Sequence, residues 1–152
     1  PDEGQGDAVR EAIAAAGLGE RLTWAGPVDS AGAARWMAES DVYVLPSVHE
    51  PYPMSVLEAM SAGLPVVVTD TCGLAPTVAR TGSGAVVDDT QPSLEDALAQ
   101  LIADPERRRR AGREGFGPGR RLRHRRRGER DARARPAARD RRPGRSCARR
   151  SR

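Results

Sequence analysis

The chain has 152 residues, with 25 arginines, no lysine, 21 acidic residues and a formal net charge of +4. This length allows one domain of ordinary size, and no apolar run approaches the roughly 18 residues that a membrane-spanning helix needs. Two cysteines that lie far apart, Cys72 and Cys147, exclude a disulfide framework and are typical of a reducing compartment.

Residues 1–106 alternate between helix-like and strand-like patterns. The expected elements, in chain order, are a helix over 7–18, a strand over 21–26, a helix over 31–39, a strand over 41–47, a helix over 54–65, strands over 65–70 and 84–89, a helix over 94–103 and a helical stretch from Pro105. Asp29 or Ser30 is expected to cap the second helix and Ser93 the helix over 94–103, while Gly63 closes the helix over 54–65. The run over 41–47 is continuously apolar, which is typical of a strand buried on both faces.

Short alternating helices and strands indicate a parallel sheet with helices on both faces. The predicted fold class is therefore α/β, with a partial Rossmann-like sheet of about four strands. Such sheets bind ligands at the carboxyl ends of their strands. Here those ends are residues 26–29, 47–53 and 69–73, which are rich in Gly, Pro, Ser and acidic residues.

The segment with the clearest chemistry is 47–70, where Glu50 follows a buried strand and Glu58 lies eight positions later in a helix. A helix that starts near Met54 or Ser55 points free backbone N–H groups into the crevice, which suits a diphosphate. The Glu58 carboxylate can accept hydrogen bonds from a ribose diol, and Glu50 can meet sugar hydroxyls. These residues would suit a ligand with a diol, a diphosphate and a further polyol, and a nucleotide sugar has all three.

Each of these residues also has a simpler explanation. Glu58 can be an acid favoured by the helix dipole, Glu50 a solvated loop residue, and Tyr52 a side chain that packs on the sheet. His49 is expected to be a loop residue and not a base. The acidic pair at 88–89 closes a strand, so we do not expect it to bind metal.

The sequence EPYPMSVLEAMSAGLPVVVTD at 50–70 resembles the E-x7-E region of the retaining glycosyltransferases of family 4, which have the GT-B fold. Further similar segments follow the family's order, at 17–28, 41–47, 72–89 and 94–115. The resemblance covers roughly residues 5–116. It implies sugar transfer from a UDP- or GDP-linked donor to an unknown acceptor in glycan or glycolipid biosynthesis, with no cofactor and no metal.

The resemblance also implies residue roles. Glu50 would be the catalytic-site residue that contacts the donor sugar and the leaving phosphate, and Glu58 would bind the donor ribose. The other donor-binding residues implied are Tyr52, Pro53, Met54 and Ser55 near the diphosphate, and Pro27 and Val28 near the base.

The sequence departs from the family at the start of its C-terminal domain, where an Arg and a Lys neutralise the diphosphate. None of the four arginines in residues 1–106 matches those positions, and we expect the N-terminal acceptor domain of the family to lie outside this chain. We therefore expect 1–116 to be a partial C-terminal nucleotide-sugar-binding domain, inactive alone. The full-length enzyme is expected in the cytoplasm, with peripheral association at the inner membrane face as an option.

The charge divides sharply along the chain. Residues 1–106 carry a net charge of −13, whereas residues 107–152 hold 21 of the arginines and carry +17. Residues 117–152 are expected to be an Arg-rich low-complexity tail, disordered or read out of frame from a high-GC bacterial gene. One alternative is nucleic-acid binding through this tail, although aromatic interleaving is absent. A second is another Rossmann-like nucleotide binder, although no G-x-G-x-x-G follows the first strand.

Overall fold

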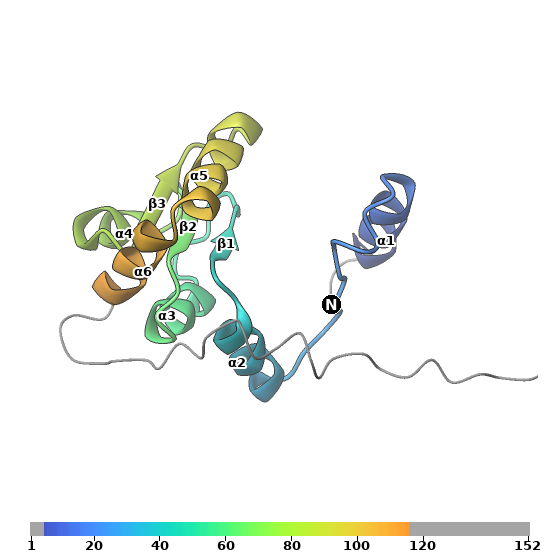
Figure 1. The fold of residues 1–152 in the computed structure, drawn as a ribbon, viewed down its shortest axis with the longest axis horizontal. Coiled ribbons are helices and arrows are strands. Elements are labelled where there is room, and N and C mark those ends of the chain that lie inside the picture. Colours follow the sequence, from blue (N-terminus) through green and yellow to red (C-terminus); the bar gives the residue numbers. More distant parts are fainter. Residues whose placement is uncertain (1–4, 116–152) are drawn as a thin grey trace, which may run out of the picture. The chain divides into compact units, whose positions relative to one another are not determined.

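A computed structural model of the chain describes residues 5–115 (Figure 1). The predicted tail at 117–152 lies outside the described residues. The helices are α1 (Gln5–Ala15), α2 (Ser30–Glu39), α3 (Met54–Ser61), α4 (Ala75–Thr81), α5 (Gln91–Ala103) and α6 (Pro105–Glu114). The strands are β1 (Tyr43–Leu45), β2 (Val66–Thr69) and β3 (Gly84–Val87). No helix among these residues is both long and apolar enough to cross a membrane.

The three strands form one parallel sheet in the order β1-β2-β3. Tyr43 is in register with Val66, and Val66 with Gly84. The predicted α/β fold class with a parallel sheet is therefore confirmed. Because the strands are parallel, their carboxyl ends share one edge of the sheet, and the loops that follow them meet there.

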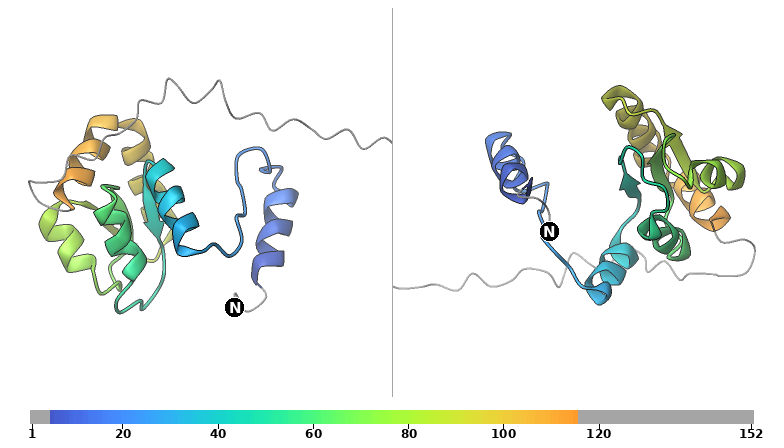
Figure 2. Two further views of the ribbon diagram at one scale, coloured as in Figure 1. Left: turned by 90° about the horizontal axis from the view of Figure 1, so that it is seen from below. Right: turned by 180° about the vertical axis from the view of Figure 1, so that it is seen from behind.

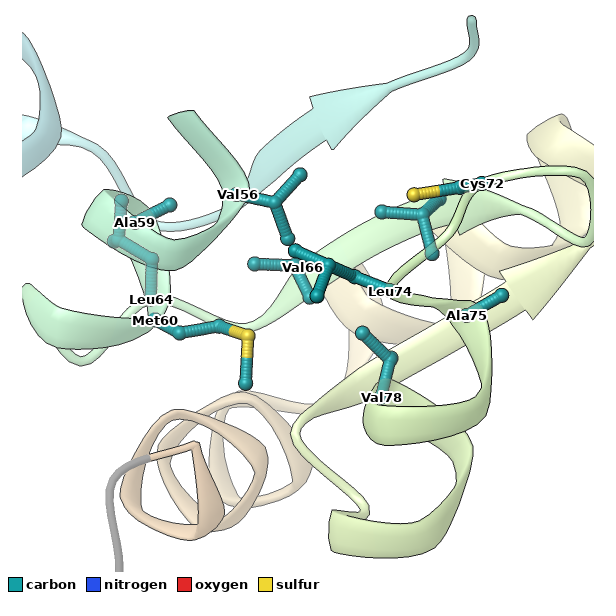
Figure 3. Packing of buried hydrophobic residues seen from close by; sticks show 10 residues of the cluster. Val56, Ala59, Met60, Leu64, Val66, Cys72, Leu74, Ala75 and Val78 are labelled. Atoms are coloured by element: carbon teal, nitrogen blue, oxygen red, sulfur yellow. The ribbon is translucent and has the colours of Figure 1, made fainter. Parts of the chain in front are cut away.

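The core lies on both faces of β2, whose four residues are all buried. Val66 and Val68 pack into a cluster with residues of α3 and α4 (Figure 3). Val67 points to the opposite face and packs with Leu101 of α5. Figures 1 and 2 show α3 and α4 on one side of the sheet and α5 on the other. This alternation is what a strand buried between two helical layers requires.

Two predicted helix ends are confirmed. The Asp29 side chain caps α2 by accepting a hydrogen bond from the Gly32 N–H at 2.7 Å. Gly63 ends α3 with a φ of 79°, and its N–H donates to the carbonyl of Met60 while the next amide donates to the carbonyl of Ala59. This pair of bonds is a Schellman motif, which needs a residue in the left-handed region.

The predicted strand at 21–26 is wrong, because none of β1 to β3 pairs with it within the described residues. Leu22 and Trp24 are exposed there. A strand needs a neighbour for its backbone N–H and C=O groups. The described sheet consequently has three strands instead of about four.

Other boundaries also need correction. Strand β1 is half-buried instead of buried on both faces, because it lies at an edge of the described sheet. Helix α5 begins at Gln91 with Thr90 as its N-cap, earlier than the expected cap at Ser93, since Pro92 fits the first helical turn. Helix α4 was not predicted; its seven residues are too few to show a helical period.

Candidate functional site

The site predicted at the carboxyl edge of the sheet is built from two loops, the β1–α3 loop (46–53) and the β2–α4 loop (70–74). The N–H of Gly73 donates to the carbonyl of Glu50 at 2.9 Å. A β-carbon added to Gly73 would lie 1.8 Å from the carbonyl oxygen of Pro51, so the two backbones are in direct contact. Only glycine permits this approach.

Threonine hydroxyls link the β1–α3 loop to the end of β2 and to the β2–α4 loop. Thr69 Oγ1 donates to the carbonyl of Ser47 at 2.5 Å. The N–H of His49 donates to Thr71 Oγ1 at 3.2 Å, and the two threonine hydroxyls lie 3.2 Å apart. Two of the three segments predicted to form the crevice, 47–53 and 69–73, are therefore brought together.

His49 has a φ of 58°, in the left-handed region. A residue other than glycine costs about 1 kcal/mol or more there and stays only where its surroundings hold it. Its side chain is exposed, and its N–H is bonded to Thr71. The strain is located next to Glu50, in the loop that also carries the exposed side chain of Tyr52.

Helix α3 begins directly after this loop, with Pro53 as a buried N-cap that has no side-chain hydrogen bond. The N–H of Val56 bonds to the carbonyl of Pro53 at 3.1 Å. Within residues 5–115, the amides of Met54 and Ser55 have no hydrogen-bond acceptor. This is expected, because the first N–H groups of a helix have no partner within the helix. These are the two amides predicted to face a diphosphate.

Glu58 lies on the outer side of α3, whereas Val56, Ala59 and Met60 are buried. Met54 precedes Glu58 by one helical turn, so both lie on the same stripe, and helical side chains lean toward the helix start. Glu58 is the fifth residue of α3, and the helix dipole acts mainly on the first turn. A purely dipole-based explanation of this exposed acid is consequently weaker than the sequence suggests.

Apolar side chains around the β1–α3 loop remain accessible. Val48, Tyr52 and Met54 expose 52%, 62% and 58% of their surfaces. Tyr52 therefore does not pack into the core, which leaves its phenol ring available to a ligand. Glu50 is half-buried, and within residues 5–115 its carboxylate makes no hydrogen bond.

The remaining predicted residues lie elsewhere. Pro27 and Val28 are exposed in the segment that leads into α2. No hydrogen bond among residues 5–115 joins them to the β1–α3 loop, so their place near a base stays a prediction.

Asp88, the first residue of the acidic pair at the end of β3, has a structural task. Asp88 accepts hydrogen bonds from the hydroxyl of Thr90 at 2.5 Å and from its N–H at 3.0 Å. These bonds, led by the one from the hydroxyl, lower the pKa of Asp88 below its usual value of 3.8. Asp88 thus orders the turn into α5.

Sequence reasoning missed the residues that hold the β1–α3 loop in place. It located 69–73 at the edge of the sheet but gave no task to Thr69, Thr71 or Gly73. A Thr at the end of an otherwise all-valine strand is the one signal that could have pointed to it.

Comparisons with known proteins show what the chain as a whole is similar to. A family model described as "Glycosyl transferases group 1" matches residues 2–116. The D-inositol 3-phosphate glycosyltransferase of Paenarthrobacter aurescens (strain TC1) is 37% identical over 99 residues, which are 64% of this chain and 24% of that protein. The 2-deoxystreptamine N-acetyl-D-glucosaminyltransferase of Streptomyces fradiae is 36% identical over 110 residues, 72% of this chain and 26% of that protein.

Among solved structures, the sucrose-phosphate synthase of Thermosynechococcus elongatus matches with a TM-score of 0.66 and 30% identity. The match covers 72% of this chain and 28% of that one. The chain thus spans about a quarter of the length of the relatives it matches.

Proposed function

The chain belongs to the glycosyl transferases group 1 family, and from this membership we propose that it binds the nucleotide-sugar donor of a retaining GT-B glycosyltransferase. The observation that carries the proposal is the pairing of two acids with a free helix start. In the sequence, Glu50 and Glu58 lie on either side of Met54 and Ser55, whose amides have no hydrogen-bond acceptor within residues 5–115. A nucleotide sugar has a sugar, a diphosphate and a ribose in the same order.

Each group of the donor then has a matching partner. The amides of Met54 and Ser55, with the positive end of the α3 dipole, bind the diphosphate. Glu58 accepts hydrogen bonds from the ribose hydroxyls, and Glu50 accepts hydrogen bonds from the donor sugar. No step in this assignment needs a cofactor or a metal. The ring of Tyr52, which is exposed, would pack against the bound donor.

The activity of the whole protein is also a proposal. We infer transfer of the sugar with retention of anomeric configuration to an acceptor bound by parts of the protein beyond this chain. The two relatives are named for acceptors as different as an inositol phosphate and 2-deoxystreptamine, so the acceptor is left open. The 152-residue chain alone should not turn over donor, because cations that stabilise a leaving phosphate contribute orders of magnitude in rate. We place the full-length enzyme in the cytoplasm of a bacterium, with peripheral contact to the inner membrane face.

The test is a nuclear magnetic resonance titration of the 152-residue chain with UDP-glucose and with GDP-mannose. We expect one of them to shift the amide signals of Met54 and Ser55. The variant Glu58→Gln should bind at least about tenfold more weakly, since hydrogen bonds to a charged group contribute about 1.5–3 kcal/mol. Glu39→Gln is the matched control, because Glu39 is an exposed helical acid that precedes β1, whereas the site lies in the loop that follows β1. Unchanged affinity of Glu58→Gln, or absence of any shift in the chain, would refute the proposal.

A further inference from the structure

We propose that Thr69 and Thr71 are positioning residues for Glu50, so that their hydroxyls decide how well the site recognises the donor sugar. The inference rests on the proposed function, in which Glu50 contacts that sugar. Neither threonine is expected to touch the donor. Both would act through the backbone of the β1–α3 loop, which their hydroxyls hold by hydrogen bonds.

The bonds around the two threonines can be ordered by counting protons. A threonine hydroxyl has one proton to donate, and the proton of Thr69 goes to the carbonyl of Ser47. In the contact between the two hydroxyls, Thr71 must therefore donate and Thr69 accept. Thr71 in turn accepts from the N–H of His49. The bonds run in one direction, from His49 through both threonines to Ser47.

Both ends of this chain of bonds lie in the same segment, two residues apart, immediately before Glu50. Bonds arranged in sequence polarise and strengthen one another. The next two residues are held by Gly73, whose N–H bonds to the carbonyl of Glu50 and whose backbone contacts Pro51. The backbone is thus fixed on both sides of Glu50. The left-handed conformation of His49 is the kind of strain that such bonds maintain.

The identity of residue 69 supports a polar task. Thr69 follows three valines in β2 and is 1% exposed. A fourth valine would have nearly the same shape, would fit the buried strand and would avoid the cost of burying a hydroxyl. We infer that the hydroxyl of Thr69 serves to bond the β1–α3 loop and not to fill the core.

The proposal predicts different effects on the two ends of the donor, the sugar and the nucleoside diphosphate. Glu58 and the amides of Met54 and Ser55 belong to α3, whereas Glu50 belongs to the loop that the threonines hold. Loss of a threonine hydroxyl should weaken the sugar contact and spare the contacts with the nucleoside diphosphate. A general loosening of the fold would weaken both.

The test compares Thr69→Val and Thr71→Val in the full 152-residue chain, titrated with UDP-glucose against UDP and with GDP-mannose against GDP. For the pair that the wild type binds, we expect each variant to lose about three- to tenfold in affinity for the nucleotide sugar, the effect of one net hydrogen bond. Affinity for the free nucleoside diphosphate should stay within about twofold. Thr69→Ser keeps the hydroxyl and should restore sugar binding. Thr81→Val is the matched control, since it removes a part-buried hydroxyl from α4 that bonds the carbonyl of Thr77.

Amide hydrogen exchange gives a readout that needs no ligand. Thr69→Val should speed exchange at His49 and Gly73, and Thr81→Val should not. Unchanged exchange at both amides would overturn the inference even if the variant binds the nucleotide sugar more weakly. Equal losses of affinity for the sugar-bearing and sugar-free ligands would overturn it as well. If the wild type binds neither ligand but the exchange result is as expected, the proposed function fails while the hydrogen-bonded link itself is upheld.

Discussion

Gly73→Ala is the most direct test of how closely the two loops of the site approach each other. The added β-carbon would lie 1.8 Å from the carbonyl oxygen of Pro51 and 2.7 Å from its carbonyl carbon. Both atoms belong to the backbone, so no side-chain rotation can relieve the contact. The φ of Gly73 is outside the left-handed region, and any loss of stability therefore comes from the contact and not from backbone strain.

The magnitude follows from three opposing contributions. Overpacking of a tight contact costs about 1–3 kcal/mol. Separation of the loops also loses the bond from Gly73 to the carbonyl of Glu50, about 0.5–1.5 kcal/mol. A stiffer unfolded chain returns about 0.4–1 kcal/mol. The free energy of unfolding should therefore fall by about 0.5–4 kcal/mol, with a central value of about 2 kcal/mol that lowers the Tm of a domain this size by about 8–16 °C.

The assay is urea unfolding of the 152-residue chain, followed by circular dichroism. Gly19→Ala is the control, because its added β-carbon meets no atom within 4 Å and its backbone is not left-handed. That variant should be as stable as the wild type, or more stable by less than about 1 kcal/mol. If Gly73→Ala unfolds at the same urea concentration as Gly19→Ala, the loops do not touch at Pro51 and the reasoning is refuted.

Two further predictions concern the same edge of the sheet. His49→Val should lower the free energy of unfolding by about 1–2 kcal/mol, because a β-branched residue is poorly tolerated at a φ of 58°. His49→Gly should stay within about 1 kcal/mol of the wild type, because glycine adopts this φ without strain. Equal urea midpoints for the two variants would contradict this prediction. Asp88→Asn should be less stable than the wild type near pH 7. Because the pKa of Asp88 is lowered in the folded state, the stabilising effect of its charge is present above pH 3.8 and is lost as the pH falls through the folded-state pKa. The difference in urea midpoint between wild type and Asp88→Asn should therefore shrink in acid. A difference that does not change with pH would exclude the charge of Asp88 as its cause.

Local signals predicted the parts of the fold that local chemistry decides. The valine run at 66–68 lies in the strand predicted over 65–70, and β2 forms there as Val66–Thr69. Asp29 and Gly63 were identified as a helix cap and a helix stop, since each acts on backbone groups within a few residues of itself. Such interactions depend on neighbours in sequence, so they can be inferred without a tertiary structure.

The sequence predictions fail where contacts between residues that are distant in the sequence determine the structure. Residues 21–26 have a strand-like pattern, but a pattern does not supply the neighbouring strand that their backbone would need. The role of Thr69 was missed for a related reason. Its hydroxyl donates to the carbonyl of Ser47 in the β1–α3 loop, 22 residues earlier in the sequence. Only the parallel register of β1 with β2 brings those two atoms together.

The charges of the described site set an upper limit on what this chain can bind alone. The start of a helix contributes about 0.3–1 kcal/mol to a nearby anion, and up to about 2 kcal/mol when partly buried. Two carboxylates, Glu50 and Glu58, flank that start, and carboxylates repel a diphosphate. A Kd of 1 mM corresponds to about 4.1 kcal/mol, so the diphosphate contacts must be supplemented by the hydrogen bonds from ribose and sugar hydroxyls to reach even that affinity. We therefore expect millimolar binding of a nucleotide sugar, weaker binding of the free nucleoside diphosphate, and no measurable binding of inorganic pyrophosphate. Pyrophosphate that bound as tightly as the nucleotide sugar would show that the two acids do not recognise hydroxyl groups.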